Sequence, residues 1–247
     1  MLKEAIEKIV SLAKPGMYEI NGDTYATEDL VRIAPYTERP EKTSFTSLDG
    51  VVKAIKAEIN RAEIAKPVFV NVAAHDSVVV FTTFRSDNLE RDYLYIAKPM
   101  LPERFNRWSS HDDAIIMLRS QFIQSEDIAY LLDLLSRISN EDTVTSDDNG
   151  LTQKVSATTG IAIRAYAEIR PRVTLAPFRT FLEVGQPESE FILRLKAGNR
   201  ESGAQPQIGL IEADGGAWKL AAKSNIANYF RAHLDDLIES GAVIVTE

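Results

Sequence analysis

The fold assignment rests on Pro177-Phe-Arg-Thr-Phe-Leu-Glu-Val-Gly-Gln-Pro-Glu-Ser-Glu-Phe-Ile-Leu-Arg-Leu195. Val, Phe, Ile and Leu are dense on both sides of its centre, and these residue types fill a pleated, buried surface. Gly185, Gln186 and Pro187 in the middle favour a turn. We therefore predict two strands, over 179–184 and 191–196, joined by a polar turn. The stretch indicates a scaffold and contains no motif of a chemical site.

Helical and strand patterns follow one another along the rest of the chain. Apolar spacings of three and four predict helices at 2–14, from Ser47 or Asp49 to about 65, from Ser109 or Ser110 onward, after Ser125, and from Ser224 to Gly241. Alternating patterns predict strands at 17–20, 23–26, 67–74, 78–85, 91–98, 143–145, 152–158, 161–169, 173–175, 207–213 and 243–245. Loops are expected at 35–45, around Pro102 and Trp108, and at 199–205. This order predicts an α+β protein with antiparallel or mixed sheets, flanking helices, an N-terminal helix and a C-terminal helix.

The period of the apolar residues changes from helical to alternating after Asn140. This change indicates an N-terminal α+β part over 1–140, with a helix, a hairpin, a helix, three strands and two helices. A C-terminal, β-rich part with a terminal helix follows over 141–247. The turn near Asp147 is a candidate boundary, but no clear linker separates the parts, so a single domain stays an alternative.

Composition excludes several classes of protein. The chain has 247 residues, which is enough to bury a core without disulfides, and it contains no Cys. Thiol catalysis and cysteine zinc sites are therefore excluded, and a reducing cytoplasm fits. The longest apolar runs, such as 78–81, are far shorter than the roughly 20 residues that cross a bilayer. Residues 1–10 lack the apolar core of a signal peptide, so we expect a cytoplasmic protein without membrane contact.

Charge is distributed unevenly along the chain. The formal net charge of −8 argues against a surface that binds phosphate backbones as a whole. Between 111 and 150, nine acidic residues stand against two basic ones, whereas between 151 and 200 eight basic residues stand against four acidic ones. Head-to-tail contact between copies would pair these segments, which favours a homo-oligomer.

No catalytic, cofactor or metal site is predicted. His75, His111 and His233 lie far apart and lack the spacing of metal ligands. His111 belongs to the helix start Ser110–Asp113, His75 to a turn, and His233 to a helix, where a packed or interface position is expected. Asp214-Gly-Gly216 matches neither phosphate-loop pattern and predicts a turn with positive φ. We therefore expect that this protein is not an enzyme.

The basic segment contains the strongest indication of a contact surface. Five arginines alternate with Tyr166, Phe178, Phe181 and Phe191; they are Arg164, Arg170, Arg172, Arg179 and Arg194. Such a mixture suits single-stranded nucleic acid, with arginines on phosphates and aromatic rings on bases. The favoured interpretation is a scaffold whose aromatic side chains point inward and whose arginines point outward from alternating strands, toward a protein partner.

One family resemblance follows from Val155-Ser-Ala-Thr-Thr-Gly-Ile-Ala162, the stretch 177–195 and Glu212-Ala-Asp-Gly-Gly-Ala-Trp-Lys219. Together with the order of the helices, these segments resemble the YfdQ-like proteins, an uncharacterised family of phage and prophage proteins. The resemblance implies a phage- or prophage-encoded protein in the host cytoplasm, of unknown activity, and carries over no catalytic residue.

These observations lead to one expected function and two alternatives. We expect a non-enzymatic protein that acts by contacts with its own copies, in a ring or shell, or with other phage or host proteins. An accessory factor that binds single-stranded nucleic acid is the first alternative. A hydrolase built from distant carboxylates is the second.

Overall fold

A computed structural model describes residues 2–12, 16–20, 23–26, 39–86, 89–102, 108–136, 143–148, 153–159, 162–196 and 207–247. The chain forms two compact units, 1–39 and 40–247. In the first unit, the helix α1 spans Leu2–Leu12, and β1 (Met17–Ile20) pairs with β2 (Asp23–Ala26) as a hairpin. Both elements were predicted, while the Asn21-Gly22 turn lies outside the described residues. The apolar side chains of α1, such as Ile6 and Ile9, are exposed.

The second unit contains a five-stranded sheet. Its order is β14 (Val243–Thr246), β4 (Val68–Ala74), β5 (Ser77–Thr82), β6 (Tyr93–Ala97) and β3 (Thr43–Phe45). The two edge strands run parallel to their neighbours and the three inner strands are antiparallel. The three inner strands and the edge strand near the C-terminus were predicted, whereas β3 lies in a segment predicted to be a loop.

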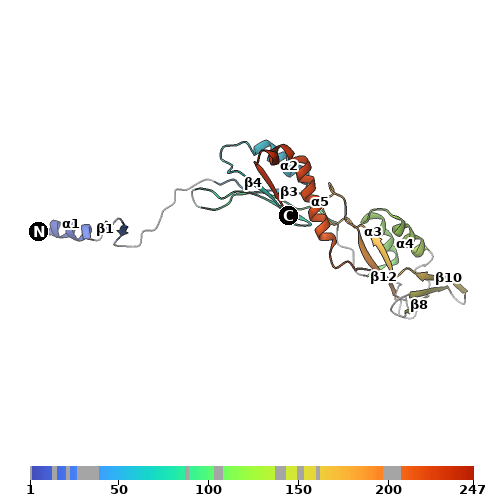
Figure 1. Cartoon of the computed structure of the whole chain (residues 1–247). Coiled ribbons are helices and arrows are strands. Elements are labelled where there is room, and N and C mark those ends of the chain that lie inside the picture. The colour runs from blue at the N-terminus through green and yellow to red at the C-terminus, as the bar shows by residue number, and fades with distance from the viewer. Residues whose placement is uncertain are drawn as a thin grey trace. The chain divides into compact units, whose positions relative to one another are not determined.

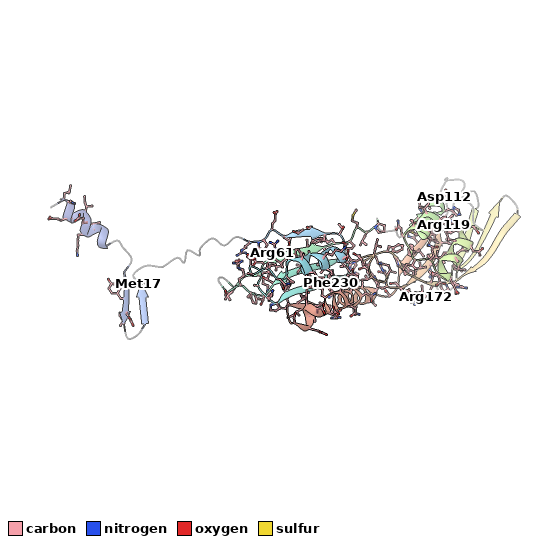
Figure 2. The ribbon with its side chains drawn as sticks, turned by 90° about the horizontal axis from the view of Figure 1, so that it is seen from above. Met17, Arg61, Asp112, Arg119, Arg172 and Phe230 are labelled. Atoms are coloured by element: carbon pink, nitrogen blue, oxygen red, sulfur yellow. The ribbon has the colours of Figure 1, made fainter. Side chains whose placement is uncertain are left out.

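Two helices pack on one face of this sheet. Figure 1 shows α2 (Leu48–Glu58) and α5 (Trp218–His233) on the same side of it. Alternate strand residues point to these helices, because side chains on a strand alternate between its faces. They form a core with both helices, in which Phe230 is fully buried (Phe230 is labelled in Figure 2). The strand members of this core are Val68, Val70, Val72, Val78, Val80, Leu94, Tyr95, Ala97 and Val243.

Helix α2 begins as predicted and ends sooner. The Ser47 side chain accepts a hydrogen bond from Gly50 N at 3.2 Å, which is an N-cap. The helix ends at Glu58, so the predicted end near residue 65 was wrong. The next backbone hydrogen bond, from Arg61 N to Glu58 O, spans only three residues. Asn60 lies at this change, and its side chain type competes with helical hydrogen bonds.

A second, antiparallel sheet has the order β11 (Arg172–Leu175), β12 (Ser189–Lys196), β13 (Gln207–Glu212) and β7 (Trp108–Ser110). Helices α3 (His111–Ser120) and α4 (Glu126–Ser136) pack against it and complete a second core. The predicted caps are confirmed, since Ser110 and Ser125 accept hydrogen bonds from Asp113 N and Ile128 N. Trp108 was placed in a loop, but it pairs with Gly209 of β13.

The third sheet consists of β8 (Thr143–Asp148), β9 (Gln153–Thr159) and β10 (Ala162–Ile169), paired antiparallel in the order β10-β9-β8. It confirms the hairpin and the following strand that the alternating pattern predicted. Residues 149 and 150 of the predicted turn and the loop 199–205 lie outside the described residues.

The predicted strand at 179–184 was wrong. These residues form an irregular loop, whereas the second half of the same stretch is the strand β12. The side chain of Gln186 replaces a strand partner: its Oε1 accepts from Arg179 N at 3.0 Å and its Nε2 donates to Phe181 O at 2.9 Å. The loop therefore satisfies its backbone groups locally and needs no neighbouring strand.

The C-terminal helix starts sooner than predicted. Helix α5 begins at Trp218, and Ser224 lies inside it, so Ser224 is not the cap. The Asp214 side chain accepts hydrogen bonds from Gly216 N at 2.9 Å and Trp218 N at 3.4 Å, which orders the turn before the helix. The expected positive φ is confirmed at Gly215 (64°) and Gly216 (84°). The helix α6 (Asp235–Glu239) follows after a break at residue 234.

Both cores combine residues from before and after position 140. Leu48 and Phe230 share the first core, and Leu118 and Phe191 share the second. The two parts predicted over 1–140 and 141–247 thus both contribute residues to each core, and both cores lie within the unit 40–247.

Candidate functional site

The face of the five-stranded sheet opposite α2 and α5 carries several large apolar side chains. The strand registers place two rows of side chains across it, because residues directly opposite each other point to the same face. The first row is Ile244, Phe69, Phe81 and Tyr93, and the second is Thr246, Asn71, Val79, Ile96 and Ser44. We call the six large apolar residues of these rows, Phe69, Val79, Phe81, Tyr93, Ile96 and Ile244, the open face.

The open face is uncovered by any described helix or strand of the unit (Figure 1). Tyr93 is 54 % exposed and Ile244 39 % exposed, and Phe84 beside them is 56 % exposed. None of the described strand residues in the two rows is charged. A sheet face that meets water normally carries polar side chains, so this composition is typical of a face that is covered by a partner.

Arg91 lies over the aromatic side chains at one end of the open face. Its guanidinium carbon is 5.0 Å from the ring centroids of both Phe69 and Phe81, and 4.0 Å from that of Phe84. Its Nη1 donates to Thr82 O at 3.0 Å. The cation is therefore fixed against the rings and forms part of the surface that a partner would meet.

Sequence reasoning missed the open face, although a signal was present. The runs Val68-Phe-Val-Asn-Val72 and Val78-Val-Val-Phe81 are apolar at nearly every position instead of at alternate positions. Such runs are typical of strands that are buried on both faces. Only one of the two faces of these strands is packed in the described structure.

Two predicted contact residues, Arg170 and Arg172, are exposed and paired within the chain. Arg170 Nη1 lies 3.4 Å from Asp127 Oδ1, and the guanidinium covers the Tyr130 ring at 4.6 Å. Arg172 Nη1 lies 2.6 Å from Glu190 Oε2 (Arg172 is labelled in Figure 2). Both pairs are more than half exposed at the arginine, so they contribute little stability. Their charges are already balanced by carboxylates of the same chain.

Arg179 is largely enclosed, unlike Arg170 and Arg172. Its side chain is 11 % exposed, its guanidinium stacks on Trp218 at 3.7 Å, and it forms an ion pair with Glu212. It also donates to Ser189 Oγ and, at 3.1 Å, to Pro187 O. Burial lowers the pKa of Arg179, while Glu212 opposes this change. An arginine held by these partners is a structural residue and is not available to a phosphate backbone.

The remaining two arginines lie on different strands. Arg194 is half-buried on β12, on the face opposite Leu193 and Leu195, and Arg164 lies on β10. The expected alternation is confirmed on β12, where Phe191 is buried and Arg194 points away from the core. Of the four arginines whose side chains the structure describes, three pair with carboxylates of the same chain; they are Arg170, Arg172 and Arg179.

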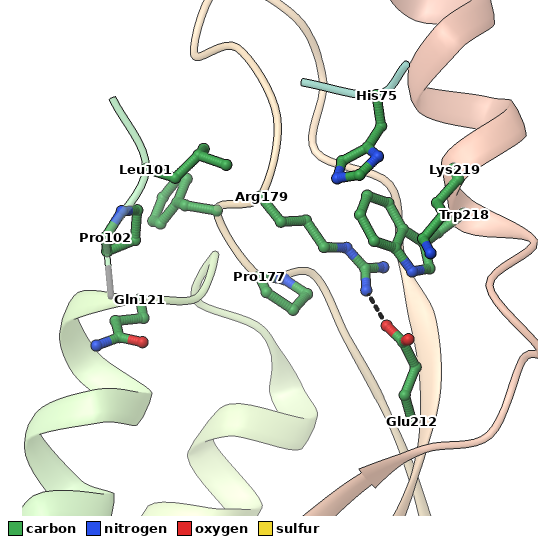
Figure 3. Close-up of a pocket in the computed structure, with 10 residues that line it drawn as sticks. His75, Leu101, Pro102, Gln121, Pro177, Arg179, Glu212, Trp218 and Lys219 are labelled. Carbon is green, nitrogen blue, oxygen red and sulfur yellow. Dashed lines mark hydrogen bonds and ion pairs between the residues drawn. The ribbon is translucent and has the colours of Figure 1, made fainter. Parts of the chain in front are cut away.

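Arg179 lines a cavity of about 340 Å³. Figure 3 shows its side chain extending toward Glu212, with His75 and Trp218 on one side of the cavity and Leu101 and Gln121 on the other. The cavity wall comes from the β4–β5 turn, the end of α3, the loop 177–179, the end of β13 and the start of α5. These segments are far apart in sequence.

A second carboxylate, that of Asp214, interacts with Arg179. Burial raises the pKa of Asp214. Three hydrogen bonds lower this pKa, from Ser189 Oγ and from the backbone N–H groups of Gly216 and Trp218, and the charge of Arg179 lowers it further. Together these interactions outweigh burial. The pKa of Asp214 therefore lies below its ordinary value, and the group stays ionised. It serves to order the turn before α5.

The histidines keep the separate places that the sequence indicated. His75 is in the β4–β5 turn with its ring against Trp218, His111 contacts Asp112 and Leu135 O, and His233 stacks on Tyr229 at an exposed position. Within the described ranges, no three His, Asp or Glu side chains gather closely enough to hold a metal ion. No helix in the part of the chain that the structure describes is both long and apolar enough to cross a membrane.

Comparisons of the chain with protein-family models, with curated proteins and with solved structures find no match. The resemblance to the YfdQ-like proteins thus stays a prediction from the residues quoted above.

Proposed function

We propose that this protein acts by self-association through the open face and carries out no chemical reaction of its own. The observation that supports this is the apolar character of both faces of the five-stranded sheet, of which only one is packed against helices. Burial of apolar surface stabilises association by about 25 cal/mol for each Å² removed from water. Aromatic residues such as Phe81 and Tyr93 are enriched in the cores of interfaces.

The partner that fits the open face best is a second copy of the chain. The protein has a net charge of −8, and two copies repel one another wherever acidic surface meets acidic surface. The rows of the open face contain no charged strand residue, so they offer a contact without this repulsion. A partner that recognised the protein by charge would bind its acidic surface instead.

The assembly that this contact supports is a two-fold dimer. When the same face of two copies meets, the interface is isologous and closes after two subunits. A ring or shell would need a second, different contact surface. Arg170, Arg172 and Arg179 each pair with a carboxylate of their own chain, so the contact proposed here does not depend on a head-to-tail pairing of charges.

Sedimentation equilibrium of the full chain tests the proposal. Val79→Lys places a charge on the central strand of the open face, and Ile116→Lys places the same charge on α3, where Ile116 is 65 % exposed. The wild type and Ile116→Lys are expected to be dimers and Val79→Lys a folded monomer, with circular dichroism as the check on folding. A monomeric wild type, or a dimeric Val79→Lys variant, would contradict the proposal.

A further inference from the structure

The Arg179 cavity has a mixed wall that the proposed self-association does not use. Its apolar part includes the rings of Trp218, Phe178 and Pro177, and the His75 ring meets Trp218 edge-on at 4.6 Å. A volume of about 340 Å³ is within the range of sites that hold small molecules. The flat side chains suit a flat, unsaturated ligand.

The charged part of the wall is positive. Arg179 and Lys219 contribute two cations and Glu212 one carboxylate, although the whole chain is acidic. Arg179 is neutralised by Glu212 at the cavity wall. Lys219 is different, because no carboxylate in the described structure forms an ion pair with it, and its Nζ lies 5.8 Å from the centroid of the Trp218 ring. Lys219 is therefore the cation that is available to a ligand.

We propose that this cavity binds a small aromatic carboxylate. The ring of such a ligand lies among Trp218, Phe178 and Pro177, and its carboxylate meets the ammonium group of Lys219. The guanidinium of Arg179, paired with Glu212, lies over the Trp218 ring and holds it in place. A neutral aromatic molecule gains the same apolar contacts but not the ion pair, so the site prefers the anion.

The proposal depends on residues that are separate from the open face, so the two proposals can fail independently. Trp218 also provides a reporter, because the chain has only two Trp residues and the indole N–H of Trp218 is buried without a hydrogen-bond partner. In protein labelled with ¹⁵N at Trp, the Trp108→Phe variant identifies the indole signal of Trp218.

The test is a titration of the full chain with 2-naphthoate and, as the neutral match, 2-naphthamide, followed by the Trp218 indole signal. We expect saturable shifts with 2-naphthoate and affinity for 2-naphthamide that is about fivefold weaker, the value of one partly exposed ion pair. Lys219→Met should reduce the affinity for 2-naphthoate to that of the amide, and Lys219→Arg should preserve it. Lys223→Met, one turn further along α5, is the matched control.

Three outcomes would overturn the inference. They are the absence of a saturable shift with 2-naphthoate, equal affinity for the acid and the amide, and equal losses in Lys219→Met and Lys223→Met. The measurement compares variants that keep the backbone of α5 unchanged, and the indole signal itself shows whether the region is folded.

Discussion

The rings of Phe69 and Phe81 stack 5.5 Å apart, centroid to centroid, at an interplanar angle of 17°, on the sheet face opposite α2 and α5. They are directly opposite each other in neighbouring strands, and Tyr93 continues the row. A cross-strand aromatic pair stabilises a sheet, but its outer surface remains apolar. The pair therefore connects folding to the proposed association.

Arg91 is expected to stabilise the aromatic row of the monomer. Arg91→Met keeps most of the side chain's apolar length and removes the cation from above three rings. We expect a loss of about 0.5–1 kcal/mol in the free energy of unfolding, which is the usual value of an exposed cation–π contact. Urea denaturation of a monomeric Val79→Lys background measures it. Arg119→Met, on the exposed side of α3, should not change the free energy of unfolding. Equal losses in Arg91→Met and Arg119→Met would contradict the stabilising role of Arg91.

The hydroxyl of Tyr95 is expected to stabilise the packing of α2 on the sheet. It donates a hydrogen bond to Glu58 Oε2 at 2.6 Å, and burial, followed by Glu58, raises the pKa of Tyr95 well above its ordinary range. Tyr95→Phe should lower the free energy of unfolding by about 1–2 kcal/mol, as for a hydrogen bond to a charged group. Tyr93→Phe on the same strand is the control, and both variants are measured in the monomeric Val79→Lys background, because Tyr93 belongs to the open face. A larger loss in Tyr93→Phe than in Tyr95→Phe would show that the interpretation of the hydroxyl is wrong.

Gln186 is expected to be essential for the conformation of the loop 179–187. Its amide makes hydrogen bonds to the backbone of Arg179, Thr180, Phe181 and Val184. Gln186→Ala leaves these backbone groups without a partner, and we expect a loss of about 2–3 kcal/mol, measured by urea denaturation. Glu188→Ala, exposed directly after this loop, should change stability little. Similar values for the two variants would refute this role of Gln186.

Asp214 is expected to make the free energy of unfolding depend on pH. Its pKa is lower in the folded protein than in the unfolded chain, so its contribution is fully present above the unfolded pKa of about 4 and is lost as the pH falls through the folded value. When the pH is lowered from 6 into the acidic range, the free energy of unfolding should therefore fall less for Asp214→Asn than for the wild type. Urea denaturation at each pH measures this free energy. Asp235→Asn, exposed on α6, should behave as the wild type. An unchanged pH dependence in Asp214→Asn would contradict this.

Local chemistry explains which parts of the structure the sequence could predict. Ser47, Ser110 and Ser125 cap helices through hydrogen bonds within three residues, and Gly241 adopts the positive φ of 71° expected after a helix. Such contacts depend on neighbours in sequence. The α+β class followed from the same local patterns.

The incorrect and missing predictions involve contacts between distant segments. The residues 179–184 have a strand-like composition, but the Gln186 amide fixes them as a loop. Arg179 pairs with Glu212, 33 positions away, and no spacing rule indicates that pair. The apolar residues on both sides of the run Val68–Val72 indicated the open face. The registers that align β4 with β5 and β5 with β6, and so place its side chains in rows, are known only from the fold.

Spin-label distances between copies test the location of the interface most directly. The chain contains no Cys, so Val79→Cys and Ile116→Cys each introduce a single labelling site. Sheets that pack face to face lie about 10 Å apart. We predict strong dipolar coupling between labels at Val79 in the dimer, at a shorter distance than between labels at Ile116. Absence of coupling at Val79, or a shorter distance at Ile116, would show that the open face is not where two copies meet.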